Sequence, residues 1–277
     1  MELVSSGVRK VWCPVGVAAG TLYVGQLVRQ TNEGVDIMAV ASGLSDQASK
    51  MVGVGLIHDG TSQNNVPFGI IVGTNKRIPT YSTTYKAESI TYVAPSSATS
   101  EDYCMVEGWA KGDLMAMVEV AILDPTVVLR SAIYNAAFGT APTVGTIASG
   151  ASTLGATVNA LEATGVASCA TVYFRTGAAA GCYRVTDDAS ATALTWDLAL
   201  TTTCAVGDTL VRINGLRPHG YSKCQLDATT KWIDCNEELT SNHFSIVVHK
   251  LDLSVPGKEY VEFTLNAYHF LAMDDIV

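Results

Sequence analysis

Four side chains in the last quarter of the chain carry the donor atoms of a zinc site: His219, Cys224, Cys235 and His243. Zinc is bound by thiolate sulfur and imidazole nitrogen, usually from compact pairs of ligands that are two to five residues apart. The intervals here are longer and irregular, and ordinary loop and core positions explain these residues more simply. The spacing therefore predicts no metal site.

Two other patterns bear on chemistry. The acidic pairs Asp187–Asp188 and Asp274–Asp275 have oxygen ligands for calcium, but each is more simply a solvated turn or chain end. The segment 53–60 is glycine-rich like a dinucleotide loop, but it lacks the third glycine at the required offset and no helical pattern follows it. Neither a nucleophile elbow nor a phosphate-binding P-loop occurs. We expect no catalytic residues, no cofactor and no enzymatic activity.

The tryptophans leave two interpretations open. They are spread along the chain as core anchors would be, whereas a sugar-binding platform would need several aromatic rings on one exposed face. The sequence does not show which faces are exposed. The four residues are Trp12, Trp109, Trp196 and Trp232.

The composition is apolar and acidic. Of the 277 residues, 48% are hydrophobic and only 16% charged, and the mean hydropathy is +0.25. No window approaches the roughly 20 apolar residues of a membrane helix, so we expect no membrane partner. Surface buried against sister subunits or a lattice explains the hydropathy, and so does the abundance of small apolar residues. A net charge of −9 argues against binding nucleic acid, which needs clustered Lys and Arg.

The cysteines predict reduced thiols. Their number is odd, no pair has C-x-x-C spacing, and the first residues lack the pattern of a secretory signal. We therefore expect a protein made and assembled in a cytoplasm, with a Cys169–Cys182 hairpin bridge as the alternative. The seven positions are Cys13, Cys104, Cys169, Cys182, Cys204, Cys224 and Cys235.

One turn pattern recurs along the chain. Gly20–Val28 indicates a strand, a tight turn at Gly25 and a second strand, because glycine accepts positive φ and apolar residues follow it at once. The same pattern returns at Lys111–Met115 and at Val206–Val211. Its repetition favours a chain built from successive β units.

The predicted fold class is all-β. Residues 1–129 indicate an N-terminal β-barrel or β-tulip-like domain, with short strands at Val8–Val15, Thr21–Arg29, Val35–Ala41, Met51–Ile57 and Pro67–Gly73. The Ala-, Gly- and Thr-rich stretch 130–165 reads as a linker, with a helical turn over Ser131–Phe138 and a weak helical pattern over 152–163.

Residues 166–277 are expected to form a second, antiparallel β domain. Its first part, 166–215, is predicted as a four-stranded meander, and its second part, 216–277, as a β-rich C-terminal segment with two strong strands. The meander strands are Ser168–Arg175, Cys182–Thr186, Ala193–Leu200 and Thr209–Ile213, and the closing strands are Phe244–His249 and Tyr260–Phe270.

A family resemblance extends this reading. The motifs Val11-x-Cys13-Pro14-Val15, Gly20–Val28, Gly53–Leu56 and Phe68–Val72 resemble the small β-barrel domain of head decoration (cement) proteins of tailed bacteriophages. The segment 177–213 resembles small β domains of other phage virion proteins. The resemblance implies a structural, non-enzymatic protein on the outer capsid surface of the virion. It also implies assembly in the bacterial cytoplasm as a homotrimer that clamps neighbouring subunits of the major capsid protein.

Two alternatives remain open at this point. Leu3–Val15 is either an arm that reaches a neighbouring subunit or simply the first strand of its own domain. The arm hypothesis rests on apolar positions that suit an interface. A receptor- or glycan-binding tail or surface protein, also all-β and trimeric, is the rival function. The candidate arm residues are Leu3, Val4, Val8, Val11, Trp12 and Val15.

Overall fold

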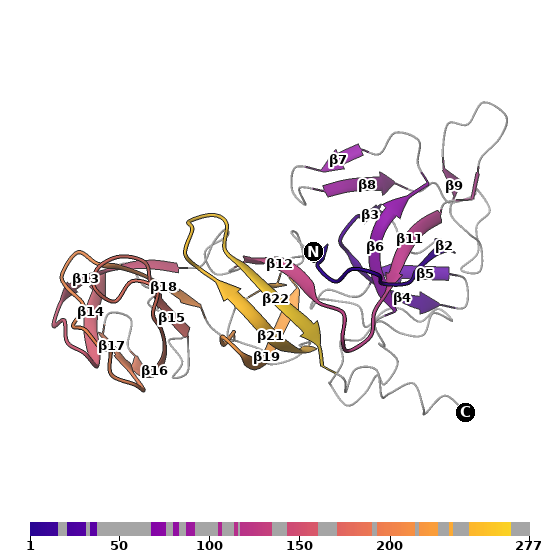
Figure 1. Cartoon of the computed structure of the whole chain (residues 1–277). Coiled ribbons are helices and arrows are strands. Elements are labelled where there is room, and N and C mark those ends of the chain that lie inside the picture. The colour runs from indigo at the N-terminus through magenta and orange to yellow at the C-terminus, as the bar shows by residue number, and fades with distance from the viewer. Residues whose placement is uncertain are drawn as a thin grey trace.

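The protein is all-β throughout the part of the chain that the computed structural model describes, so the predicted fold class is confirmed at this level (Figure 1). No helix in this part is long and apolar enough to cross a membrane. The described residues are 1–15, 21–31, 34–37, 68–75, 80–82, 87–91, 105–106, 114–115, 117–134, 143–159, 171–189, 193–213, 216–226, 233–234 and 244–266.

The N-terminal unit contains a five-stranded and a three-stranded antiparallel sheet. The five-stranded sheet has the order β2 (Lys10–Pro14), β11 (Met117–Ile122), β6 (Gly69–Thr74), β4 (Leu27–Thr31) and β5 (Gly34–Ile37). The three-stranded sheet has the order β3 (Thr21–Tyr23), β8 (Ala87–Thr91) and β7 (Thr80–Ser82), and β9 (Met105–Val106) pairs with β10 (Leu114–Met115). Val15, Leu22, Val28, Ile71, Val118 and Val120 form the core of this unit.

The glycine turn between β3 and β4 forms as predicted. Gly25 has φ +89°, and the strands leave it on either side. The repeat of this turn pattern at Val206–Val211 is also confirmed, because Gly207 has φ +94° and β18 (Thr209–Ile213) follows it. The third instance, Lys111–Met115, has its turn outside the described residues, as has the expected strand Met51–Ile57.

Residues 143–213 form a closed six-stranded antiparallel barrel. Its order is β13 (Thr143–Ser149), β14 (Gly155–Asn159), β17 (Ala193–Trp196), β16 (Tyr183–Ala189), β15 (Thr171–Phe174) and β18, which returns to β13. Phe174 and Trp196 meet edge to face in its core, with ring centroids 5.3 Å apart. Closure leaves no free strand edge.

The barrel corrects the predicted linker over 130–165. Where the structure describes this stretch it is mostly strand, rather than linker, helical turn or the 152–163 helix. Residues 130–134 belong to β12 (Leu129–Tyr134) of the central sheet, and a turn at 150–154 joins β13 to β14. Threonine favours strands, and small residues fit the narrow barrel interior. Gly155 shows this directly, since a Cβ there would lie 2.7 Å from the Leu194 carbonyl oxygen. The four expected meander strands all occur, but as part of a closed barrel.

A six-stranded sheet lies between the other two units (Figure 1). Its order is β1 (Glu2–Leu3), β12 (Leu129–Tyr134), β20 (Ile233–Asp234), β19 (Gly220–Leu226), β21 (Phe244–Asp252) and β22 (Tyr260–Leu265). The last strand, β22, also pairs with β12, and β12–β20 is the single parallel pair among the described strands. The two closing strands predicted from the sequence are thus confirmed as β21 and β22.

The largest apolar cluster runs through this central sheet and continues into both neighbours. Leu129, Val248 and Phe263 belong to the sheet itself, Ile70 comes from the N-terminal unit and Ile213 from the barrel. The barrel is inserted between β12 and β19, so the central sheet is built from segments on both sides of it. The molecule is therefore a row of three β units that share buried apolar surface.

Candidate interaction surfaces

The candidate arm residues are divided between the core and the surface of their own chain. Leu3 and Val8 pack against the large shared cluster, and Val11 and Val15 join the core of the N-terminal unit. Val4 and Trp12 instead are 43% and 52% exposed. Of the two interpretations of the tryptophans, a core anchor fits Trp196, which is 2% exposed, but not Trp12.

Backbone contacts attach the start of the chain to the central sheet. Glu2 and Leu3 pair with Arg130 and Leu129 as strand β1, the Val4 amide donates to the Val128 carbonyl at 2.9 Å, and the Val128 amide donates to Ser5 Oγ at 2.8 Å. This arrangement agrees with the interpretation of Leu3–Val15 as part of its own fold. Contact of the same residues with a neighbouring subunit remains a proposal.

The first residue is packed against the glycine turn. The amino group of Met1 donates to the Gly25 carbonyl oxygen at 2.9 Å, and a Cβ on Gly25 would lie 2.2 Å from the Met1 carbonyl oxygen. Burial lowers the pKa of this amino group from 8.0 to about 6, against a smaller opposing effect of Glu2. The absence of a side chain at residue 25 thus lets the two segments meet.

Buried polar groups join the barrel to the central sheet. Arg175, at the end of β15, forms an ion pair with Glu259 and donates through Nε to the Leu253 carbonyl at 2.8 Å. Both side chains of the pair are almost inaccessible, 6% and 4% exposed. A charge this deeply buried requires its partner, since either group alone would be left desolvated and uncompensated.

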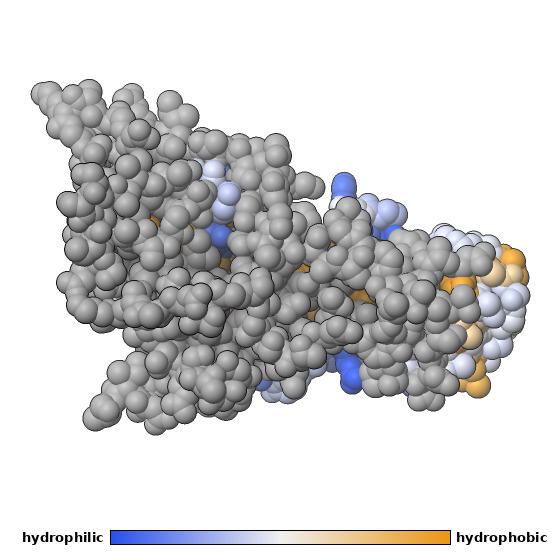
Figure 2. All heavy atoms as spheres, turned by 180° about the vertical axis from the view of Figure 1, so that it is seen from behind, coloured by the Kyte–Doolittle hydropathy of each residue, from blue (hydrophilic) through white to orange (hydrophobic). Residues whose placement is uncertain are grey.

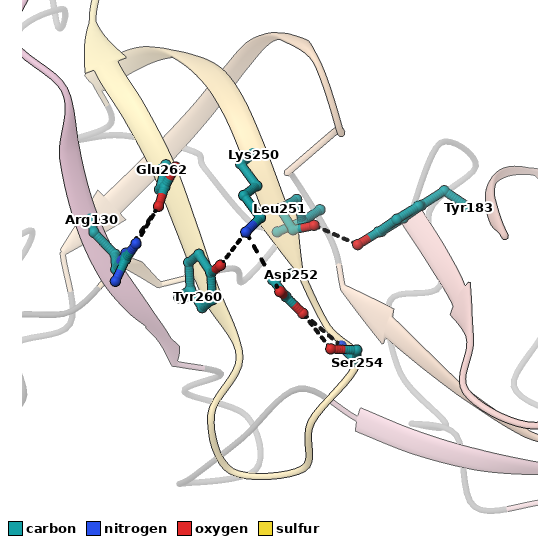
Figure 3. Close-up of polar contacts among 8 residues, drawn as sticks. All are labelled: Arg130, Tyr183, Lys250, Leu251, Asp252, Ser254, Tyr260 and Glu262. Atoms are coloured by element: carbon teal, nitrogen blue, oxygen red, sulfur yellow. Dashed lines mark hydrogen bonds and ion pairs between the residues drawn. The ribbon is translucent and has the colours of Figure 1, made fainter. Parts of the chain in front are cut away.

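A tyrosine adds a second polar contact at this junction. The Tyr183 hydroxyl donates to the Leu251 carbonyl (Figure 3). The centroid of its ring lies 4.7 Å from that of Tyr173. Burial raises the pKa of Tyr183 to about 12, so the phenol stays protonated and keeps donating. Together with Arg175, it fixes how the barrel is oriented on the hairpin β21–β22.

The outer face of the central sheet carries a ladder of charged side chains around Tyr260 (Figure 3). Arg130 donates to Glu262 from Nε at 3.0 Å and from its terminal nitrogen at 2.5 Å. Its guanidinium lies 4.7 Å from the Tyr260 ring centroid, and the Lys250 ammonium lies 5.1 Å from it. Lys250 also donates to the Tyr260 hydroxyl at 2.5 Å and lies 3.9 Å from Asp252.

This cluster is organised for cohesion between strands rather than for proton transfer. The hydrogen bond to Tyr260 raises the pKa of Lys250, so the amine stays charged and is a poor nucleophile or base. The hydroxyl of Ser254, 2.6 Å from Asp252, lowers the pKa of that carboxyl. All these groups are cross-strand or turn neighbours, which is the usual arrangement of stabilising pairs on a solvated sheet face.

An apolar surface lies at the free end of the barrel. Figure 2 shows hydrophobic side chains gathered at the end of the molecule farthest from the N-terminal unit. Leu154, Leu198 and Val206 are 53%, 63% and 67% exposed and come from loops at the same end of the barrel strands. Neighbouring contacts hold these loops in place, because Trp196 Nε1 donates to the Thr153 carbonyl at 2.7 Å and Arg184 Nε to the Leu198 carbonyl at 2.7 Å.

The other residues that the sequence singled out are not brought together where the structure describes them. No group of three or more metal-binding side chains occurs within the described ranges. His219 lies in an exposed turn and Cys224 in β19, while Cys235, His243, Asp274–Asp275 and the loop 53–60 fall outside the described residues, as do Trp109 and Trp232. Cys13, Cys182 and Cys204 are free thiols.

Sequence reasoning missed Arg175, Tyr183 and Glu259, because nothing local marks them. Arg175 and Glu259 are 84 residues apart in the sequence, so only the fold brings them together. In the turn 217–221, the zinc hypothesis concerns His219 alone and leaves out its neighbours Arg217 and Tyr221.

Comparison of the chain with protein families, curated proteins and solved structures finds no match.

Proposed function

We propose that this chain is a capsid decoration (cement) protein of a tailed bacteriophage. It binds the outer surface of the phage head as a homotrimer and stabilises contacts between subunits of the major capsid protein. It is a non-enzymatic structural protein, made in the host bacterial cytoplasm, without a cofactor and without a nucleic-acid or membrane partner.

The observation that carries this proposal is a rigid all-β body with exposed apolar side chains on structured surfaces. Val4 and Trp12 are exposed on the N-terminal arm, and Leu154, Leu198 and Val206 at the free end of the barrel. Aromatic and aliphatic side chains held on a rigid frame lose little conformational entropy on binding, so they suit protein–protein contact. Placing such side chains on two units allows one molecule to contact more than one neighbour.

The finer fold of the N-terminal unit belongs to the same proposal. Its five-stranded sheet curls until the edge strands β2 and β5 approach within 8 Å between Cα atoms. The glycine turn that carries the family resemblance joins the two sheets of this unit. Both features support a decoration-type β-barrel or β-tulip, followed by the second β domain.

Head binding tests the proposal directly. Heads of the phage that encodes this chain, prepared without the protein, are mixed with the purified chain and sedimented. We expect saturable co-sedimentation and a higher temperature of head disruption, because bound clamps resist separation of shell subunits. Absence of binding to these heads, with folded protein confirmed by circular dichroism, would contradict the proposed function.

The assembly state is a separate expectation. Mass photometry of the free protein should show a trimer. If the free protein is a monomer instead, electron cryomicroscopy of decorated heads should show it assembled as trimers on the shell. A stable monomer at isolated positions on the head would disprove the trimer while leaving decoration intact.

A specific observation also favours the rival function, a receptor- or glycan-binding surface protein. Tyr221 on β19 is 72% exposed, more than any other large hydrophobic side chain among the described residues. Such an aromatic ring offers a stacking face to a sugar. The two functions are compatible on one virion surface.

A further inference from the structure

The turn that leads into β19 presents three side chains with unused binding capacity. Arg217, His219 and Tyr221 alternate along the chain, and all three are exposed. The Arg217 amide is held by Ser222 Oγ at 3.1 Å, which fixes the start of the segment. These residues therefore occupy one ordered stretch of surface where β19 begins.

Their polar groups are free, in contrast to those of Arg130, Arg175 and Arg184. Within the described part of the chain, the Arg217 guanidinium, the His219 imidazole and the Tyr221 hydroxyl form no hydrogen bond or ion pair. The guanidinium groups of Arg130, Arg175 and Arg184 are all occupied by a carboxylate or by carbonyl oxygens. In a chain of net charge −9, an unneutralised cationic turn is a distinct local feature.

The backbone of this turn is unusual. His219 has φ +56° and is the single non-glycine residue with positive φ among those described. This conformation is uncommon for a residue other than glycine, and histidine adopts it more often than most other residues do. The following Gly220 pairs with Val248, which places His249, also exposed, across from His219 on the adjacent strand.

We propose that Arg217, His219, Tyr221 and His249 form a binding site for an acidic saccharide, one that carries a carboxylate. This site is independent of the proposed decoration function. The guanidinium binds the carboxylate with two parallel hydrogen bonds, and the exposed tyrosine ring packs against the apolar face of the sugar. The His219 imidazole donates to or accepts from its hydroxyl groups. Nε2 of His249 lies 3.2 Å from Thr264 Oγ1, so His249 offers its other ring nitrogen.

The ligand class follows from this combination of groups. A nucleic acid would require a longer run of basic residues to neutralise successive phosphates. An uncharged sugar would leave the guanidinium without a partner. One carboxylate beside a ring of hydroxyl groups matches one guanidinium beside an aromatic face and two imidazoles.

Paired probes test the site on the full chain. Isothermal titration calorimetry measures binding of three acidic saccharides, sialyllactose, a glucuronate disaccharide and digalacturonate, against their neutral counterparts lactose, cellobiose and digalactose. We expect at least one acidic member to bind about tenfold or more tightly than its neutral counterpart, the size of effect that one charged hydrogen-bonded pair provides.

Variants locate the binding. Arg217→Gln and Tyr221→Ser should each raise the dissociation constant of that acidic saccharide about tenfold. Arg217→Lys keeps the charge without the bidentate geometry, so its dissociation constant should lie between those of the wild type and Arg217→Gln. Arg9→Gln and Val255→Ser, at exposed positions in other parts of the molecule, are matched controls and should bind like the wild type. All the substituted side chains are exposed, and unchanged thermal unfolding confirms folding.

Three outcomes overturn the inference. No preference for any acidic saccharide removes the ligand class, and full binding by Arg217→Gln removes the site. Equally tight binding of hexaglutamate would show that the turn attracts negative charge without recognising a sugar. Head binding is measured separately, so loss of the proposed function and loss of this site are distinguishable.

Discussion

The central sheet is joined to its two neighbours by different kinds of contact. Toward the barrel, the junction includes a buried ion pair, Arg175–Glu259, and the phenol of Tyr183. Toward the N-terminal unit, the start of the chain joins through backbone pairing of β1 with β12 and through Met1 packed on Gly25. Apolar surface is shared at both junctions.

The difference lies in what each junction requires. The barrel junction depends on a buried charge pair and on a phenolic hydroxyl, so truncation of one side chain leaves a buried polar group without its partner. The contacts of residues 1–3 with β12 and Gly25, here called the arm junction, depend on main-chain atoms. They are compatible with many different side chains but require close approach at Gly25. Four substitutions or conditions separate these two kinds of dependence.

Removal of one partner of the buried ion pair should have the largest effect. Glu259→Ala leaves the Arg175 guanidinium buried without its carboxylate, and we expect the free energy of unfolding to fall by about 3–5 kcal/mol. Urea denaturation measures the loss, and hydrogen exchange shows whether barrel amides are exposed first. The double variant Arg175→Met/Glu259→Leu should recover most of it, and a cost under about 1 kcal/mol for Glu259→Ala would show that the pair is not a constraint.

Substitution of Gly25, on which Met1 packs, should have the second largest effect. Gly25→Ala places a Cβ on a residue with φ +89° and only 2.2 Å from a main-chain oxygen, so the arm must move. We expect a loss of about 2–4 kcal/mol in unfolding free energy, combining strain and lost packing. Gly181→Ala is the matched control, because Gly181 has φ +88° but nothing within 4 Å of its added Cβ. Equal losses in the two variants would mean that contact with Met1 contributes nothing.

Acidification from pH 8 to pH 6 should weaken the contact of Met1 with Gly25. The Met1 amino group has a pKa of about 6 when folded and 8.0 as its ordinary value, so the folded chain binds fewer protons between these pH values. Stability therefore rises with pH from 6 to 8 and is lost as pH falls through that window, by about 2 kcal/mol. Denaturation midpoints at several pH values measure the slope. A chain acetylated at Met1 has no such amine and should lack this contribution.

Loss of the phenolic hydroxyl should have the smallest effect. Tyr183→Phe removes the donor to the Leu251 carbonyl but keeps the ring beside Tyr173. We expect about 1 kcal/mol, the typical value of one neutral hydrogen bond at a half-buried position. Thermal unfolding measures it, with Tyr221→Phe as a control at an exposed hydroxyl. A larger loss than that of Glu259→Ala would reverse the order of the two contacts at the barrel junction.

Local signals in the sequence predicted the strands well. The alternation around Gly25 and Gly207 and the apolar runs of β21 and β22 are properties of neighbouring residues, and the structure confirms them. The barrel was not predicted, because β13 and β14 consist of small residues and threonine whose strand character depends on what they pack against. Gly155 is an example, since its lack of a side chain matters only because the Leu194 carbonyl lies against it in the folded barrel.

The interaction surfaces were predictable only in part. Trp12 was named as an arm residue from its position, but its exposure depends on how β2 lies at the edge of its sheet. Arg175 and Glu259 carry no local signature of burial, since charged residues are usually exposed. The positive φ of His219 likewise follows from the turn geometry and not from any recognisable motif.

The barrel begins and ends on adjacent strands. Thr143 on β13 lies opposite Arg212 on β18, so the chain enters and leaves the unit side by side. A unit whose two ends are adjacent can be exchanged for another closed unit, or lost, without changing the path of the central sheet. Recombination at these two points would give related proteins a different closed unit on the same central sheet.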